Sequence, residues 1–221
     1  MTPPMTPPMT MLYRLDTSAA QIAQSFAARQ GDDPWQPAHV APGSFAPIIT
    51  TGREFVAGPR PSGEPSRRII PRLWGVPPPP SAGDNGRAVL TVRNLESPFW
   101  IGNLRNSEFR CLVPATSFME WGRADVQTGK RRQCWFALSD QPVFAFAGVW
   151  KDSEIPSFAL VTCEANAALR HEGRETMPVI LPADPAAQHV WLNGDWGRAR
   201  ELVQPYSSSS MLVGSGQGDT R

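Results

Sequence analysis

The stretch CLVPATSFMEW, residues 111–121, decides the interpretation of this chain. Its first part belongs to an apolar run that predicts a β-strand over Arg110–Val113. Its second part places the acidic residue Glu120 between Met119 and Trp121, at the end of an apolar segment. Such a carboxylate is a pocket acid or base, a surface group, or a structural partner of an arginine. A role as an acid requires burial, because burial raises the pKa of a carboxyl group.

Short apolar runs continue on both sides of this stretch. We expect further strands at Leu12–Leu15, Phe45–Thr50, Glu54–Ala57, Ala88–Val92, Gln133–Leu138, Val143–Trp150, Phe158–Thr162 and Met177–Leu181. Asp16, Thr17 or Ser18 can cap a first helix, and Ser18 and Gln21 have capping-box spacing. Further helices are expected at Glu164–His171, at Asp184–Leu192 and at Asp195–Leu202, and polar loops at Arg60–Arg72 and Pro77–Gly86. Many short strands with few helices predict an α+β fold with a curved, partly closed, mainly antiparallel β-sheet and a few flanking helices.

The length of 221 residues fits one domain with short tails. We expect residues 1–9, which repeat the unit MTPP, to form a disordered Pro-rich tail. Residues 10–206 are expected to form the single domain, and residues 207–221 a disordered Ser/Gly-rich tail. Met1, Met5 and Met9 each precede a threonine, so translation from Met9 is an alternative start.

The composition narrows the possible partners. A net charge of +1 excludes a polycation, so any nucleic-acid site must be a local patch. Cys111, Cys134 and Cys163 have no metal-binding spacing, and neither a phosphate-binding loop nor a dinucleotide fingerprint is present, so we expect no metal and no cofactor. The first residues lack the charged-then-apolar layout of a signal peptide, and no apolar run is long enough for a membrane span. These features predict a cytoplasmic protein that does not bind membranes.

Several motifs follow one another in the order known from one family. They are Leu12-Tyr13-Arg14, His39-Val40-Ala41-Pro42-Gly43, Leu73-Trp74-Gly75-Val76-Pro77, the stretch 111–121, Phe144–Trp150 and Met177–Leu181. Together they resemble the SOS response-associated peptidase-like (SRAP) family. The resemblance implies the SRAP α+β domain, a monomer, and a positively charged groove for single-stranded DNA that carries abasic sites in the DNA damage response.

The resemblance also implies a specific chemistry. In that family a cysteine becomes the N-terminal residue once the initiator Met is removed. Its α-amine condenses with the aldehyde of the open abasic sugar, and its thiolate closes a thiazolidine ring. The same cysteine is credited with cleaving a propeptide, which gives the peptidase label. An α-amine has a pKa of about 7.7–8.0, so part of it is nucleophilic near pH 7.

This sequence departs from the family pattern at the reacting residues. Alignment on Leu12-Tyr13-Arg14 places Thr10 at the position of the cysteine. The family asparagine falls on Thr91, and the family histidine falls on Arg174, with His171 a little earlier as a displaced proton shuttle or a helix C-terminal residue. Glu120 is kept. The catalytic candidates are therefore Glu120, Thr10 and His171.

The resemblance also gives DNA-binding candidates. Arg14 and Arg93 would contact phosphates, His39 and Thr91 would donate hydrogen bonds, and Trp74 would stack on a base. Trp74 is alternatively a core residue. Thr162 and Asn166 match a family element beside the groove, and Thr162 is alternatively a helix cap.

Three hypotheses remain open. The first is a protein that binds single-stranded DNA at abasic sites, with its covalent chemistry and autopeptidase activity weakened or lost because Thr10 replaces the cysteine. The second is an active cross-linking or lyase enzyme that uses an N-terminal Thr amine. The third is a non-catalytic protein-interaction module.

Overall fold

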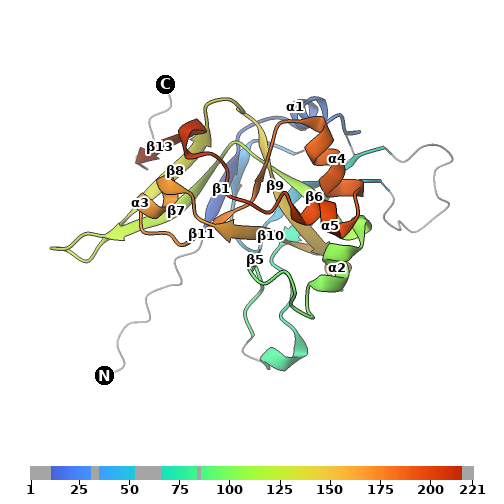
Figure 1. Cartoon of the computed structure of the whole chain (residues 1–221), viewed down its shortest axis with the longest axis horizontal. Helices are drawn as coiled ribbons and strands as arrows, with labels where there is room; N and C mark the ends of the chain where they lie inside the picture. The colour runs from blue at the N-terminus through green and yellow to red at the C-terminus, as the bar shows by residue number, and fades with distance from the viewer. Residues whose placement is uncertain (1–10, 31–34, 53–65, 84–85, 216–221) are drawn as a thin grey trace.

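The computed structural model describes residues 11–30, 35–52, 66–83 and 86–215. Within these residues the strands form two sheets (Figure 1). The smaller sheet has the order β13-β8-β7-β1-β2, and every pair in it is antiparallel. Its strands are β1 (Leu12–Leu15), β2 (Ala38–Val40), β7 (Ser117–Ala124), β8 (Arg131–Leu138) and β13 (Met211–Ser215).

The larger sheet has the order β11-β10-β4-β3-β6-β9-β12, and β5 also pairs with β10. Its strands are β3 (Phe45–Thr50), β4 (Arg68–Trp74), β5 (Thr91–Val92), β6 (Arg110–Ala115), β9 (Phe144–Lys151), β10 (Ser157–Glu164), β11 (Thr176–Pro178) and β12 (Ile180–Leu181). Strand β10 pairs in parallel with β4 and β5 and antiparallel with β9, so the sheet curls back toward itself. The prediction of a curved, mainly antiparallel α+β fold is confirmed.

The stretch 111–121 joins the two sheets. It forms most of β6 and the first half of β7, and the chain passes from one sheet to the other at Thr116. The backbone N–H and the hydroxyl of Thr116 both donate to the carbonyl of Arg14, at 2.8 and 3.1 Å, and the hydroxyl accepts from the N–H of Asp16 at 3.0 Å. These bonds fix the crossing against the end of β1. The strand predicted at Arg110–Val113 is confirmed, whereas β7 was not foreseen by the sequence pattern.

In the described part of the chain, five α-helices flank the sheets: α1 (Ala19–Ser25), α2 (Ile101–Arg105), α3 (Ala167–His171), α4 (Pro185–Asn193) and α5 (Trp196–Arg200). Short 3₁₀ turns lie at Pro80–Ala82, Ser107–Phe109 and Ser208–Ser210. Figure 1 shows α2, α4 and α5 gathered at one end of the molecule, away from α3 and the β7–β8 hairpin. The predicted cap is confirmed, because the Ser18 hydroxyl accepts from the N–H of Gln21 at 3.2 Å.

A buried arginine holds the end that carries these three helices. Arg110 of β6 has no solvent exposure. Its guanidinium donates to the carbonyls of Trp191 at 2.5 Å, of Leu104 at 2.7 Å, and of Gly194. These carbonyls lie at or beside the C-terminal ends of α4 and α2, where carbonyl groups lack partners within the helix and a positive charge is favourable.

Two expectations from sequence are corrected. The expected polar loop Arg60–Arg72 contains most of β4, because Ile69 and Ile70 are buried and β4 pairs with β3 along its whole length. The expected disordered tail from Ser207 contains β13, which pairs with β8 and covers its edge. The strand expected at Glu54–Ala57 and the tail at residues 1–9 lie outside the described residues.

Candidate functional site

A pocket of about 160 Å³ lies where the ends of several strands meet. Its walls come from β5, β7, β10 and β11, from the end of β4, and from the residues beside these strands. The lining residues are Met11, Trp74, Leu90, Thr91, Arg93, Glu120, Thr162, Arg174, Thr176, Met177 and Pro178. Five of the residues singled out from the sequence therefore line one cavity, although they lie far apart along the chain.

Glu120 is the acidic residue of this pocket. It lies on β7 and is 6 % exposed. Its Oε2 atom is 3.0 Å from Nε of Arg174, so the two side chains form an ion pair. Burial raises the pKa of Glu120 to about 7, although Arg174, the backbone N–H of Trp121 and Arg93 each lower it. The carboxyl group is therefore poised to change protonation near neutral pH.

Thr91, Arg93 and Thr162 are placed by the pairing of β5 with β10. The two strands run parallel, with Leu160 opposite Thr91 and Val161 opposite Val92. The Thr162 hydroxyl donates to the carbonyl of Val92 at 3.0 Å, which locks the end of β5 to β10. Arg93 follows directly and is exposed at the pocket rim. A guanidinium in this place is available to an anionic ligand.

Trp74 lies at the bottom of the pocket in the core. Its side chain has no solvent exposure, and its indole N–H donates to the carbonyl of Leu90 at 3.2 Å. Its ring lies 5.2 Å from that of Tyr13 and is stacked against Phe158 at 6.4 Å. The ring therefore offers no exposed face to a base. Its position matches the alternative stated for Trp74, that of a core residue.

Arg14 and His39 lie away from this pocket, on the smaller sheet, where they are directly opposite each other in the β1–β2 pair. The Arg14 guanidinium lies over the ring of Trp135 at 4.0 Å, and the His39 ring lies 5.7 Å from it. The structure thus brings these two candidates together with a tryptophan that the sequence did not single out.

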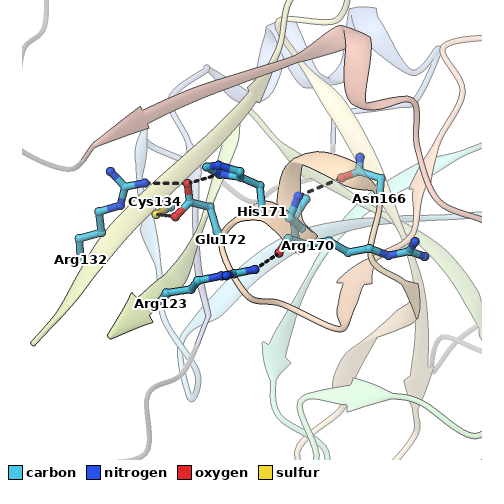
Figure 2. A network of polar contacts seen from close by, with 8 residues as sticks. Arg123, Arg132, Cys134, Asn166, Arg170, His171 and Glu172 are labelled. Atoms are coloured by element: carbon cyan, nitrogen blue, oxygen red, sulfur yellow. Dashed lines mark hydrogen bonds and ion pairs between the residues drawn. The ribbon is translucent and has the colours of Figure 1, made fainter. Parts of the chain in front are cut away.

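His171 and Asn166 belong to a polar network at α3 (Figure 2). The His171 side chain is 83 % exposed, and its Nδ1 atom lies 3.3 Å from Glu172, which is also bonded by Arg132 and by the thiol of Cys134. It does not line the pocket. His171 is the last residue of α3, the position that the helix C-terminal alternative describes.

The amide of Asn166 is fully used by the fold. Its oxygen caps α3 by accepting from the N–H of Leu169 at 3.1 Å, and its nitrogen donates to the carbonyl of Tyr206 at 2.7 Å. The cap of this helix is therefore Asn166 and not Thr162. Asn166 is buried and does not line the pocket.

Thr10 lies outside the described residues, and the next residue, Met11, lines the pocket. The sequence missed the wall formed by Thr176, Met177 and Pro178, although the motif around Met177 was recognised. It also gave no role to Arg174 beyond its alignment with the family histidine. The spacing of Arg174 before that motif was the available signal, but the ion pair with Glu120 is a property of the tertiary structure.

The described residues hold neither a metal-binding cluster nor a membrane-spanning helix. Among them, no group of three or more His, Cys, Asp or Glu side chains is arranged to hold a metal ion. None of the helices in that part of the chain is long and apolar enough to cross a membrane.

Comparisons with known proteins agree with the motifs. Residues 9–215 match the family model described as SOS response associated peptidase (SRAP). Abasic site processing protein YoqW of Bacillus subtilis is 32 % identical over 159 residues, which cover 66 % of this chain and 68 % of YoqW. Abasic site processing protein YoaM of the same species is 32 % identical over 161 residues, which cover 66 % of this chain and 67 % of YoaM.

Solved structures share the fold. A protein from Bacteroides thetaiotaomicron has a TM-score of 0.70 at 20 % identity, with 94 % of this chain and 92 % of that chain covered. A phage-related protein from Bordetella bronchiseptica has a TM-score of 0.70 at 17 % identity, with 95 % of each chain covered. With the family model matching nearly the whole described domain, this chain belongs to the SOS response associated peptidase (SRAP) family.

Proposed function

We propose that this protein binds single-stranded DNA at abasic sites and holds the base-free sugar in the pocket around Glu120. The support comes from its family and from relatives that carry the name abasic site processing protein. A sugar must leave the base stack to enter a pocket, and single-stranded DNA presents it at the least cost in unstacking.

The buried carboxyl group of Glu120 carries the proposal. It lies in a cavity of about 160 Å³, and a cavity of about 150 Å³ accommodates a six-membered ring. A five-carbon sugar is therefore of a size that fits. Among the described residues that line the pocket, Glu120 carries the one carboxyl group, and Thr91 and Arg93 beside it offer hydrogen-bond donors to sugar oxygens and phosphate.

The residues at the reacting positions favour reversible binding over a permanent covalent link. A thiazolidine needs a thiol, and Thr10 supplies a hydroxyl, which is a far weaker nucleophile at neutral pH. At the position of the family histidine, Arg174 supplies a guanidinium, which offers hydrogen-bond donors and no acceptor. Proton transfer in this pocket would therefore depend on Glu120.

The direct test measures affinity by fluorescence anisotropy. The probes are a single strand with a central tetrahydrofuran residue, which is a stable abasic analogue, the intact single strand, and the intact duplex. We expect the abasic single strand to bind most tightly. Glu120→Leu, which replaces the carboxyl group by an apolar side chain, should lower that preference. Leu replacement of the exposed Glu201 is the matched control. Equal affinity of the wild type for all three probes would contradict the proposal.

A second candidate is a Schiff-base enzyme that uses the amine of an N-terminal Thr10. It is favoured by the position of Met11, the residue after Thr10, in the wall of the same pocket as Glu120. The amine would add to the open aldehyde and lose water, with Glu120 giving a proton to the departing hydroxyl. The resulting imine would be hydrolysed again or would permit β-elimination of the strand.

Borohydride separates the two candidates, because it reduces an imine to a stable secondary amine. Abasic single-stranded DNA is incubated with protein whose translation starts at Met1 or at Met9, and the products are separated on a denaturing gel. A shifted band that depends on borohydride and on the Met9 start supports the amine chemistry. If neither a shifted band nor strand cleavage is seen, reversible binding is the candidate that remains. Absence of any salt-dependent binding to DNA would favour a protein-interaction module.

A further inference from the structure

The outer face of the smaller sheet carries a second concave site, distinct from the pocket around Glu120. It is an open groove of about 570 Å³ lined by residues of β1, β7, β8 and β13. Arg14, Trp135 and Gly214 are among its lining residues, and none of them lines the first pocket. None of the proposed chemistry uses this groove.

Trp135 is the centre of the groove. It is half-buried, although it lies on a strand whose neighbours Cys134 and Phe136 are buried on the opposite face. One side of the indole is occupied by the Arg14 guanidinium at 4.0 Å. A stacked guanidinium holds the ring in place and still exposes its own N–H groups along the edge.

Beside Trp135 on the sheet lies a position that carries no side chain. On β13, the residue directly opposite Trp135 is Gly214. A Cβ atom placed on Gly214 would have nothing within 4 Å, so the space above it is open. Its φ angle is not positive, so neither the backbone nor close packing requires a glycine there. The missing side chain leaves a slot beside an aromatic ring.

Arg14 supplies the charge of the site. Its Nε atom is buried without a hydrogen-bond partner, and no carboxylate among the described residues forms an ion pair with its guanidinium. His39, opposite Arg14 in the β1–β2 pair, has its ring 5.7 Å from that of Trp135 but does not line the groove. Asp16 also lines the groove, but it lies outside ion-pair distance of Arg14. A planar ring beside an unpaired cation is the arrangement that binds a base and its phosphate in single-stranded nucleic acid.

We propose that this groove is a second contact for the DNA strand, in which Trp135 stacks on the base of a nucleotide a few positions away from the abasic site and Arg14 binds the adjacent phosphate. The inference rests on the proposed function, because it requires that the sugar of the same strand occupy the pocket. Strand β1 connects the two places: Met11, just before β1, lines the pocket, and Arg14 lines the groove. Three residues along a strand span roughly 10 Å, a distance that a few nucleotides bridge.

The test separates bases from phosphates. All probes are single strands with a tetrahydrofuran residue as the abasic analogue. The first has base-bearing flanks, the second has flanks of the same length made only of tetrahydrofuran residues, and the third has a single nucleotide on each side. Affinities are measured for the wild type, Trp135→Ala, Trp135→Phe and Gly214→Leu. Gly102→Leu is the matched control, since Gly102 also has open space around it but lies on α2.

We expect Trp135→Ala and Gly214→Leu to weaken binding of the base-bearing probe by about tenfold, because stacking contributes about 1–3 kcal/mol per base. Neither variant should change binding of the other two probes. Trp135→Phe should keep most of the affinity, and Gly102→Leu all of it. If Trp135→Ala loses affinity for every probe, its melting temperature shows whether it has lost its fold. In that case the result for Gly214→Leu decides whether the groove contacts the base.

The outcomes separate the two proposals. If the wild type binds none of the probes, the proposed function is wrong. If it binds them but Trp135→Ala and Gly214→Leu bind like the wild type, only the second contact is wrong. If the probe with base-free flanks binds as tightly as the probe with base-bearing flanks, base stacking is overturned. The groove would then recognise negative charge alone, and an acidic peptide could also bind there.

Discussion

Nε of Arg174 lies 3.0 Å from Oε2 of Glu120, across a pocket whose walls come from both sheets. From the sequence, Glu120 had three possible roles, and the structure combines two of them: the side chain is an arginine partner and a pocket carboxyl group. Burial raises the pKa of Glu120 and Arg174 lowers it, and burial dominates.

Glu120 should make the stability of the protein depend on pH. Its pKa is about 7 in the folded protein against 4.5 as the ordinary value, so folding takes up a proton between these two pH values. The wild type should therefore lose stability as the pH rises from about 4.5 to about 7, by on the order of 3 kcal/mol. Glu120→Gln should remove this dependence. Urea unfolding of both proteins at pH 5 and pH 8 measures it, and parallel curves would contradict the assigned burial.

Arg174→Gln should destabilise the protein mainly above neutral pH. At pH 8 the Glu120 carboxylate is charged, and without Arg174 it would be buried with no ion-pair partner, which costs about 2 kcal/mol for a pair that is partly exposed. At pH 5 Glu120 is protonated, so the loss should be small. The double variant with Glu120→Gln should show no such difference between the two pH values. A loss that is equal at both pH values would mean that Arg174 acts through packing alone.

Arg93→Gln should weaken DNA binding in a salt-dependent way. The side chain is exposed at the pocket rim, where it would contact one phosphate. Loss of one phosphate contact lowers the slope of log K against log salt concentration by about 0.7 for single strands. Anisotropy titrations at several salt concentrations measure the slope, with the exposed Arg198 of α5, changed to Gln, as the control. An unchanged slope of log K against log salt concentration would mean that Arg93 contacts no phosphate of the bound strand.

Arg110→Met should be among the most destabilising single changes at the helical end. Methionine fills much of the space but leaves the carbonyls of Leu104, Trp191 and Gly194 without their donor. Each buried carbonyl that loses its partner costs about 1–3 kcal/mol, so the total should exceed about 3 kcal/mol. Arg110→Lys should rescue little, since one ammonium cannot reach three carbonyls. The free energy of unfolding in urea is the readout, and Arg198→Met is the control.

The sequence by itself determined the fold class and the family, and it selected Glu120 as a candidate. These rest on local patterns, namely short apolar runs and ordered motifs, that a linear chain displays directly. It also aligned Thr10 with the family's cysteine, which stays a prediction because Thr10 lies outside the described residues. The sequence pattern did not predict β4, because arginines and a proline interrupt its apolar residues. It did not predict β13, because Ser and Gly residues surround that strand.

Only the tertiary structure decided which candidates lie together. Thr91, Glu120 and Thr162 line one pocket because β5, β7 and β10 pass beside it, whereas His171 and Asn166 are held at α3 by contacts with Glu172 and Tyr206. The slot beside Trp135 depends on register, which places Gly214 opposite the ring. Register, burial and ion pairing arise between segments far apart in the chain, so no local pattern encodes them.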